Sequence, residues 1–403
     1  MTQIATGVFK SLVAKKQSAL GTKAVAAGAQ IYRRVTSTID LAKETYKSNE
    51  IRTSQQRSDF RHGLRSVSGT INGELSVGTY QEFMASVLRS SWATVSPYAA
   101  GLDVTAAATA PQFVDASGGF LTAGLKVGMV GRWTGFAPTT NNAKNFLITA
   151  LTSTNMTGVY LDGTAVVADA AGDTVTFTPV GKEISIPVTG HTRDYWTIEH
   201  NFSDIVQSEQ FTDCVFGAVN VKLPATGMAT VEFPVMGLDM DTSTAAYFTT
   251  PTAASNGDNL AAVNGALYVA GVAVALITSM DISINGNVTS VGSVVGSNVA
   301  PDITPGAFDV SGSMTVLFQD ATMRDYFVNE TEVSVVAVFT TNNSATAGFQ
   351  TYIMPVVKIG GASKDDGEKG LIMTMPYVAI ENTAGGTGTA TNATTITIQD
   401  SAA

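Results

Sequence analysis

Cysteine is almost absent from this sequence of 403 residues, in which Cys214 is the only one. A single cysteine excludes an intrachain disulfide, so folding does not require an oxidising compartment. We interpret Cys214 as a buried structural thiol, with a reactive thiol as the alternative. The amino terminus also lacks the charged, apolar and small-residue order of an export signal. These absences predict a protein that folds and assembles in a reducing cytoplasm.

Long apolar runs are missing too. The longest, Leu267 to Ile277, is much shorter than the roughly 20 residues of a membrane-spanning helix. We therefore expect no membrane segment and interpret the run as one or two buried strands. Only 14% of the residues are charged, whereas Val, Thr, Ala and Gly are abundant, which suits β-structure.

Chemistry-bearing patterns are also lacking. The three histidines, His62, His191 and His200, have no partner at metal-ligand spacing. Asp194 and Glu199 lie close together, but two acids on a strand-like segment are too common to indicate a general acid and base. No P-loop, dinucleotide fingerprint or nucleophile elbow occurs. We expect no enzyme activity, no cofactor and no metal.

What the chain does contain is a series of short strand-like runs from Phe120 to Ile398, separated by Gly, Asn, Asp and Pro. Runs of this length and spacing predict sandwiches or barrels rather than a parallel sheet with crossover helices. Asn285-Gly286 predicts a tight hairpin turn, because both residues tolerate positive φ.

One strand-then-helix segment occurs twice. The copy that begins at Val67 returns without gaps, shifted by 243 positions, at Val310. In each copy apolar residues first alternate, as in a strand, and then follow the spacing of a helix. This indicates an internal duplication, with chance similarity as the alternative. The residues predicted to form the core face of the two helices are Tyr80, Phe83 and Met84 in the first copy and Met323, Tyr326 and Phe327 in the second.

Charge is distributed unevenly. Residues 1–66 hold 12 Lys and Arg against 4 Asp and Glu, whereas the remainder holds 11 against 29. A basic cluster can indicate nucleic-acid binding, but no binding motif accompanies it and the acidic body would repel DNA. Docking of the basic segment on the acidic surface of a neighbouring copy uses both halves of the asymmetry, and we prefer it.

The stretch from Ser48 to Trp92 resembles the major tail tube proteins of long-tailed bacteriophages, and in particular the larger class with a duplicated tube fold. That family tends to open with S-x-E-I-R, continue through a basic segment and a G-x-I-x-G-E-L-S strand, and end with a T-Y-x-x-F helix and a Trp. Further blocks follow in the family's order, so that the resemblance spans about residues 20–380. They are Gly118–Phe120 with Gly124–Gly128, Tyr195–Asp204, Phe211–Val215, Gly312–Phe318 and Tyr352–Lys358.

The resemblance implies a mainly β fold with two tail-tube-type sandwich or barrel units, each with a short helix, and a small inserted β-barrel module. We expect the first unit at residues 46–101 and 181–255, the inserted module at 102–180 and the second unit at 256–403. Residues 1–45 are predicted to be an assembly arm. The part from Val8 to Ile31 is expected to form an amphipathic helix or to stay flexible until it packs on the next ring.

The resemblance also implies a structural virion protein that polymerises into stacked rings, a tail tube through which DNA passes into the host. Its partners would be further copies of itself and the tape-measure, tail tip and terminator proteins, in a virion tail assembled in the bacterial cytoplasm. A trimer with pseudo-sixfold symmetry is the preferred ring, and a hexamer is the competitor. The alternative functions are another virion β-protein, such as a capsid decoration or tail accessory, and a secreted or surface-layer β-protein.

Candidate assembly residues precede the first strand-helix copy. They are Arg52, Arg57, Arg61 and Arg65, which are expected to pair with acids on a neighbouring subunit. A solvated basic loop is the alternative for each of them. An acidic body would in turn suit a channel wall, because carboxylates repel the phosphates of passing DNA. For any one carboxylate, the alternative is a solvated residue on the outer surface.

Overall fold

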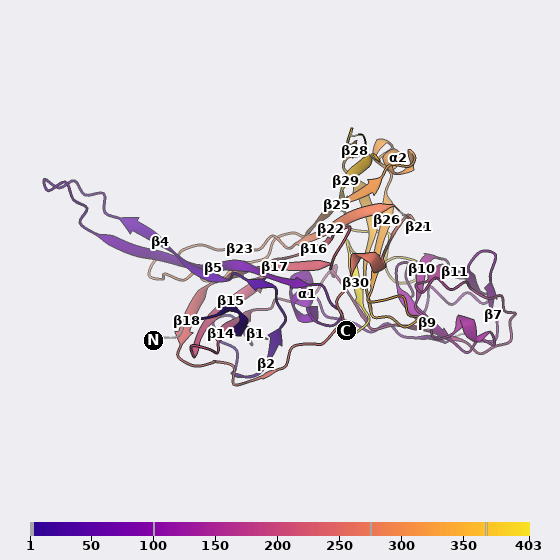
Figure 1. Ribbon diagram of the computed structural model, residues 1–403, viewed down its shortest axis with the longest axis horizontal. Helices are drawn as coiled ribbons and strands as arrows, with labels where there is room; N and C mark the ends of the chain where they lie inside the picture. The colour runs from indigo at the N-terminus through magenta and orange to yellow at the C-terminus, as the bar shows by residue number, and fades with distance from the viewer. Residues whose placement is uncertain (1–3, 100, 275, 367, 369) are drawn as a thin grey trace.

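The computed structural model describes residues 4–99, 101–274, 276–366, 368 and 370–403. The protein is mainly β, with sandwich sheets and a half-barrel sheet, which confirms the expected fold class. In the described part the α-helices are α1 (Gln81–Leu88) and α2 (Thr322–Val328), and short 3₁₀ turns are η1 (Gly7–Phe9), η2 (Thr139–Asn141) and η3 (Ala262–Asn264). Figure 1 shows three parts: the first unit around α1, the second unit with α2 at its far end, and the inserted module on the right.

The first unit is built from strands on both sides of α1. They are β1 (Lys10–Lys16), β2 (Ala27–Tyr32), β3 (Thr36–Ser37), β4 (Asp40–Lys47), β5 (Phe60–Glu74), β14 (Trp196–Phe202), β15 (Gln207–Phe216), β16 (Ala218–Leu223), β17 (Thr230–Gly237), β18 (Asp239–Ser243) and β19 (Thr250–Thr252). One sheet runs β19, β2, β1, β14, β15, β18. The other runs β4, β5, β17, β16, and β15 pairs with β17 where the two sheets meet.

The core of this unit forms around Phe83 of α1, which is fully buried. Its ring stacks on Tyr32 and Phe216, with ring centres 4.1 and 4.2 Å away, and meets Trp196 and Phe233 edge-on. These four rings come from β2, β15, β14 and β17. One helical side chain therefore ties both sheets together, and burying an aromatic side chain of this size contributes about 2–3 kcal/mol.

The first strands of the chain belong to this sandwich, so the amphipathic helix expected from Val8 to Ile31 is wrong, whereas ordering of the segment on the next ring stays a prediction. Leu12 and Ala14 face the core around α1, whereas Val13 packs in a separate cluster on the other side of the strand. This alternation needs the strand period of two, and β1 obtains it by pairing with β14 and β2 along its length. Pairing with a distant strand overrode the local helical pattern.

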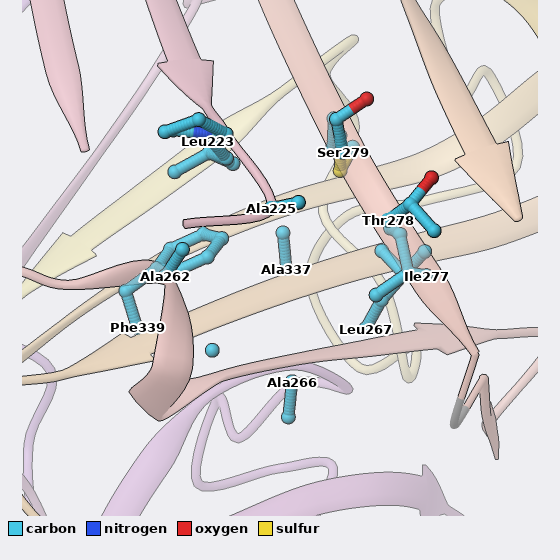
Figure 2. Close-up of a pocket in the computed structure, with 13 residues that line it drawn as sticks. Leu223, Ala225, Ala262, Ala266, Leu267, Ile277, Thr278, Ser279, Ala337 and Phe339 are labelled. Carbon is cyan, nitrogen blue, oxygen red and sulfur yellow. The ribbon is translucent and has the colours of Figure 1, made fainter. Parts of the chain in front are cut away.

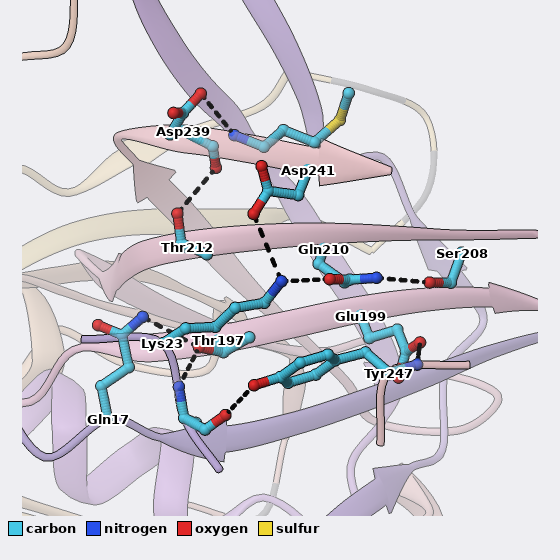
Figure 3. Close-up of polar contacts among 12 residues, drawn as sticks. Gln17, Lys23, Thr197, Glu199, Ser208, Gln210, Thr212, Asp239, Asp241 and Tyr247 are labelled. Carbon is cyan, nitrogen blue, oxygen red and sulfur yellow. Dashed lines mark hydrogen bonds and ion pairs between the residues drawn. The ribbon is translucent and has the colours of Figure 1, made fainter. Parts of the chain in front are cut away.

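Polar contacts fasten the loop after β1 to the same sheet (Figure 3). The Lys23 ammonium donates to the amide oxygen of Gln210 and lies 3.4 Å from the Asp241 carboxylate. Thr197 accepts the backbone N–H of Ala24 at 3.0 Å. The segment expected to be a separate arm is thus held by its own chain, and its role in assembly stays a prediction.

The second unit repeats the pairing order of the first. Its strands are β20 (Gly265–Val269), β21 (Val272–Ala273), β22 (Ile277–Asn285), β23 (Thr289–Ser290), β24 (Ile303–Thr304), β25 (Asp309–Leu317), β26 (Val333–Thr340), β27 (Phe349–Ile359), β28 (Ser363–Lys364), β29 (Ile372–Ala379) and β30 (Thr397–Asp400). The order β20, β26, β27, β29, β25, β22 matches β1, β14, β15, β17, β5, β4, with every pair antiparallel. The duplication seen in the sequence is therefore a duplication of the fold.

The apolar run from residue 267 to 277 contributes to β20, β21 and β22, apart from residue 275, which lies outside the described residues. The tight turn predicted at Asn285-Gly286 is wrong, because β22 ends there and its partner β25 starts only at Asp309. An Asx turn forms instead: Asn285 Oδ1 accepts the N–H of Asn287 at 2.9 Å, and Asn287 takes the positive φ of 47°.

The inserted module has its own sheet and its own core. Its strands are β6 (Tyr98–Ala99), β7 (Val104–Ala107), β8 (Gln112–Asp115), β9 (Val130–Thr134), β10 (Phe146–Leu151), β11 (Asn155–Tyr160) and β12 (Thr176–Pro179), in the order β6, β12, β9, β10, β11, β8, β7. Trp133 lies at its centre against Phe113, Phe136 and Phe177. The side chain of Gln399 on β30 exchanges two hydrogen bonds of 2.8 Å with the backbone of Val130, which attaches the module to the second unit. The residue boundaries proposed between these parts stay a prediction.

Candidate assembly interface

Three of the four candidate arginines lie on the outer part of the hairpin formed by β4 and β5, which projects from the molecule (Figure 1). Arg52 pairs with Glu50 at 3.1 Å, Arg61 pairs with Asp59 at 2.9 Å, and Arg57 donates to a backbone carbonyl of the same hairpin at 3.0 Å. The Arg61 guanidinium lowers the pKa of Asp59. All three arginines are exposed, and all their contacts are local to the hairpin.

Arg65 is different, because it is half-buried at the base of the hairpin. Its Nη1 lies 2.7 and 2.8 Å from the two carboxylate oxygens of Asp239 on β18. Its backbone N–H donates to Asn298 of the second unit at 2.8 Å. Arg65 therefore joins parts of its own chain, and the structure does not place it beside the three exposed arginines.

Other basic residues of the head also pair with acids of the same chain. The basic head and the acidic body therefore attract each other within one chain, whereas the sequence had suggested attraction between neighbouring chains. The pairs are Lys16 with Glu82 at 2.8 Å and with Asp194 at 3.1 Å, and Lys23 with Asp241 at 3.4 Å.

The two helices differ sharply in burial. Phe83 and Met84 on α1, and Tyr80 immediately before it, are all buried. On α2, Met323 and Tyr326 are only partly buried against the core, and Phe327 is 40% exposed, so the expected core position of Phe327 is wrong. The adjacent Val328 is 61% exposed. The reason is that α1 is enclosed by two sheets, whereas the outer side of α2 has no layer over it among the described residues.

A glycine in each copy explains part of the sequence match. A Cβ on Gly69 would lie 2.6 Å from the carbonyl oxygen of Thr38, and a Cβ on Gly312 would lie 2.0 Å from that of Asp281. Thr38 and Asp281 are themselves related by the shift of 243 positions. Both hairpins therefore need a residue without a side chain where their strands approach closely.

The two units join edge to edge through β16. This strand pairs with β17 of the first unit on one side and with β22 of the second unit on the other. The equivalent of β16 in the second unit is the short strand β28, which pairs with β29, and no described strand lies on its other side. At the opposite end of the sheet β4 pairs only with β5 among the described strands. The continuous sheet from β4 to β28 therefore has a free edge at each of its two ends among the described strands.

Apolar residues are also uncovered beside the β28 edge. Val378 and Ile380, at the end of β29, are 49% and 37% exposed. Their equivalents in the first unit are Met236 and Leu238, and Leu238 is only 3% exposed. It is covered by a cluster from the long connection between β22 and β25, which includes Ala300 and Ile303. Sequence reasoning missed these edges because the partner of an edge strand leaves no mark in the local pattern.

Glu183 lies where the two units meet, on β13 (Lys182–Ser185), which pairs with β30. Burial raises the pKa of Glu183 to about 7, and the charge of Lys126 opposes the rise. The free thiol Cys214 is fully buried, and burial raises its pKa. A raised thiol pKa is typical of an unreactive structural cysteine.

Figure 2 shows an apolar pocket near the place where β16 and β22 join the two units. It lies between the end of β16 and strands β20, β22 and β26. The hydroxyls of Thr278 and Ser279 are the only polar side-chain groups that line it. The described residues contain no group of three or more His, Cys, Asp or Glu placed to hold a metal ion. Nor does any described helix have the length and apolar character to cross a membrane. The features that stand out are therefore edges and faces rather than a pocket.

Comparison with known proteins adds one positive finding. The model of the family described as "Phage tail tube protein" matches residues 10–388, which is nearly the whole chain. No curated protein matches the sequence.

Proposed function

The chain belongs to the phage tail tube protein family, and from this membership we propose that copies of it close into rings that stack into a tube for the passage of viral DNA. Membership makes it a structural protein of the virion tail. The ring and the channel are proposals that go beyond family membership. The proposed partners are further copies of the chain and the tape-measure, tail tip and terminator proteins, with assembly in the host cytoplasm.

The observation that carries this proposal is the junction between the two units. Strand β16 joins one unit to the next by edge pairing, and the chain leaves the equivalent edge of the second unit free. Repeating the same step adds another chain head to tail. A head-to-tail contact is heterologous, and it closes into a ring when its rotation divides a full turn.

The same observation favours a trimer with pseudo-sixfold symmetry over a hexamer. Each chain supplies two units of the same pairing order, so three chains would supply the units of a six-membered ring. Half of the junctions would then lie within chains, as the β16 and β22 pair does, and half between them. In the competing hexamer only one unit of each chain would line the channel.

One face of the continuous sheet suits a channel wall. On β5, β17, β16, β22 and β25 the residues that alternate with the core point away from both helices, and most of them are Ser, Thr or Asn. The charged residues in these positions are Glu74, Glu232, Asp281, Asp309 and Lys222. Lys and Arg bind DNA phosphates because each contact releases counterions. A wall with more carboxylates than cations would therefore bind the passing duplex weakly and let it slide.

Negative-stain electron microscopy of the purified protein tests the proposal. Hollow tubes or stacked rings are expected, and averages should resolve two non-identical lobes in each third of a ring. Six equivalent chains in each ring would overturn the trimer, and dispersed compact particles under all assembly conditions would overturn the tube.

The exposed arginines are tested in the same assay. Reversing the charge at Arg57 and Arg61 together is expected to weaken polymerisation if they pair with acids on a neighbour. Changing both to Lys keeps the charge and serves as the control. Normal tubes from the reversed variant would remove these two residues from the interface.

A further inference from the structure

We infer that the segment 361–365 of one subunit adds as a strand to the free edge of residues 38–42 in the next subunit, with Ser363 opposite Asp40. This rests on the proposed ring and specifies which residues form its seam. The occupant of each free edge is thus a second copy of this chain.

The register comes from the two hairpins of the chain. Leu41 lies opposite Val67 in the first unit, and Ile284 lies opposite Val310 in the second. Both pairs are related by the same 243 positions that relate the sequences. The two hairpins are therefore equivalent residue by residue on both of their strands, and contacts of one can be transferred to the other.

The junction inside the chain then supplies the pairing. Asn220 on β16 lies opposite Glu232 on one side and Ser283 on the other. In the second unit, Ser363 lies opposite Thr374, the equivalent of Glu232. Ser363 is therefore the equivalent of Asn220. The equivalent of Ser283, 243 positions earlier, is Asp40, which gives the register of the seam.

Both edges are free to receive a strand. All of β4 except Leu41 is exposed, whereas only three of its eight equivalents, residues 283–290, are exposed. The N–H of Leu41 donates to the Asp40 carboxylate at 2.7 Å instead of to a strand. At the other end, Ser363 and Lys364 are both exposed. Antiparallel strand addition would satisfy the backbone groups of both edges.

The uncovered apolar residues support the same neighbour. Within the chain, the connection between β22 and β25 covers Leu238 of the first unit. The equivalent connection is the tip of the β4 and β5 hairpin, and it would cover Val378 and Ile380 of the preceding subunit. That hairpin carries exposed apolar residues of its own, namely Tyr46, Ile51 and Phe60. Mutual burial of these side chains would remove apolar surface that a lone subunit leaves in water.

Charge at the seam is complementary as well. Within the chain, Arg89 donates to two carbonyls at the base of the second hairpin, those of Gly286 and Gly306. The residue that takes the same left-handed position after α2 is Glu330, and the equivalent of Gly286, 243 positions earlier, is Lys43. The seam would bring this carboxylate toward this ammonium. Opposite charges at an interface select the partner and its register.

Disulfide cross-linking tests the register. Ser363→Cys and Asp40→Cys in one chain would place two Cα atoms about 4.5–5.5 Å apart across the seam, within disulfide reach. The matched control combines Ser363→Cys with Glu44→Cys, which lies four residues away on the same edge. Cys214 is buried and is expected to stay unreacted. On oxidation of assembled tubes, we expect the first pair to convert the monomer band into a ladder that stops at one closed ring, and the control to stay monomeric.

Three results would overturn the inference while leaving the tube intact. They are tubes in which the first pair does not cross-link, tubes in which the control cross-links instead, and a ladder without an end, which would mean contact between rings. If the unmodified chain forms no tubes, the proposed function fails and the seam fails with it. Hydrogen exchange on unmodified protein is independent of any variant. Amides of residues 38–42 and 361–365 should be protected on assembly, and unchanged exchange there would refute the seam.

Discussion

The first and second units have the same pairing order, yet they are covered to different degrees. In the first unit the helix is buried between two sheets and the β16 edge is occupied. In the second unit the helix is partly bare, the β28 edge is free, and Val378 and Ile380 face solvent. The first unit receives the second unit at its β16 edge, whereas the equivalent β28 edge of the second unit receives no described strand of this chain. Exposed apolar surface here marks an incomplete repeat rather than a flaw in packing.

The largest expected effect comes from the two helix positions related by the duplication. Phe83→Ala should lower the free energy of unfolding of the isolated subunit by about 3–5 kcal/mol, because it empties a fully buried aromatic site. Tyr326→Ala should cost about 1 kcal/mol or less, since that ring is only partly buried. Denaturant unfolding of both variants measures the difference. Equal costs would break the contrast between the units.

The stability of the protein should depend on pH through Glu183, which lies at the boundary between the units. The carboxyl of Glu183 has its pKa raised from 4.5 to about 7, so between these values the folded state holds the proton more tightly than the unfolded state. Stability therefore falls as pH rises through this window. Glu183→Gln removes this loss and should gain up to about 3 kcal/mol at pH 8 but nothing near pH 4.

Urea unfolding at the two pH values measures the Glu183 effect. The exposed Glu330→Gln serves as the control and should change stability little at either pH. A gain from Glu183→Gln that is equal at both pH values would refute the linkage, because it would have to come from packing instead.

The equivalent glycines Gly69 and Gly312 test a position at which the two units are alike. Gly69→Ala and Gly312→Ala should each cost about 1–3 kcal/mol, because the new methyl group meets backbone of the opposite strand. Gly360→Ala is the control, since a Cβ there would be 3.6 Å from its nearest neighbour. The measurement is thermal or denaturant unfolding. A harmless Gly312→Ala would mean that the hairpins are not equivalent at this point.

The smallest effect on stability is expected at the bare face of α2. Phe327→Ser should lower the free energy of unfolding by only about 0.5–1 kcal/mol, because the side chain is 40% exposed and no described layer covers that side of the helix. Its effect should appear instead as a slower growth of tubes, followed by light scattering. Val263→Ser, another exposed apolar position, is the control. A large loss of subunit stability would mean that Phe327 belongs to the core after all.

Local features of the fold could be predicted from the sequence because they repeat along the chain. Alternation with a period of two indicated the strands, and the i, i+3, i+4 spacing indicated both helices. The shift of 243 positions indicated two units, and the close approach at Gly69 and Gly312 accounts for part of that match. The ordered family blocks predicted the tail tube family, which the match over residues 10–388 confirms.

Whatever depends on a distant partner was decided only by the tertiary structure. Residues 10–16 form a strand because β14 lies beside them, and Arg65 forms an ion pair with Asp239. The periodicity around Phe327 is the same as around Met84, yet one is exposed and the other buried. A hydrophobic stripe specifies which side of an element is apolar, but the surrounding layers determine whether that side is covered. For this protein the sequence determined the repeated unit, and the tertiary structure determined which edges and faces of each unit stay open.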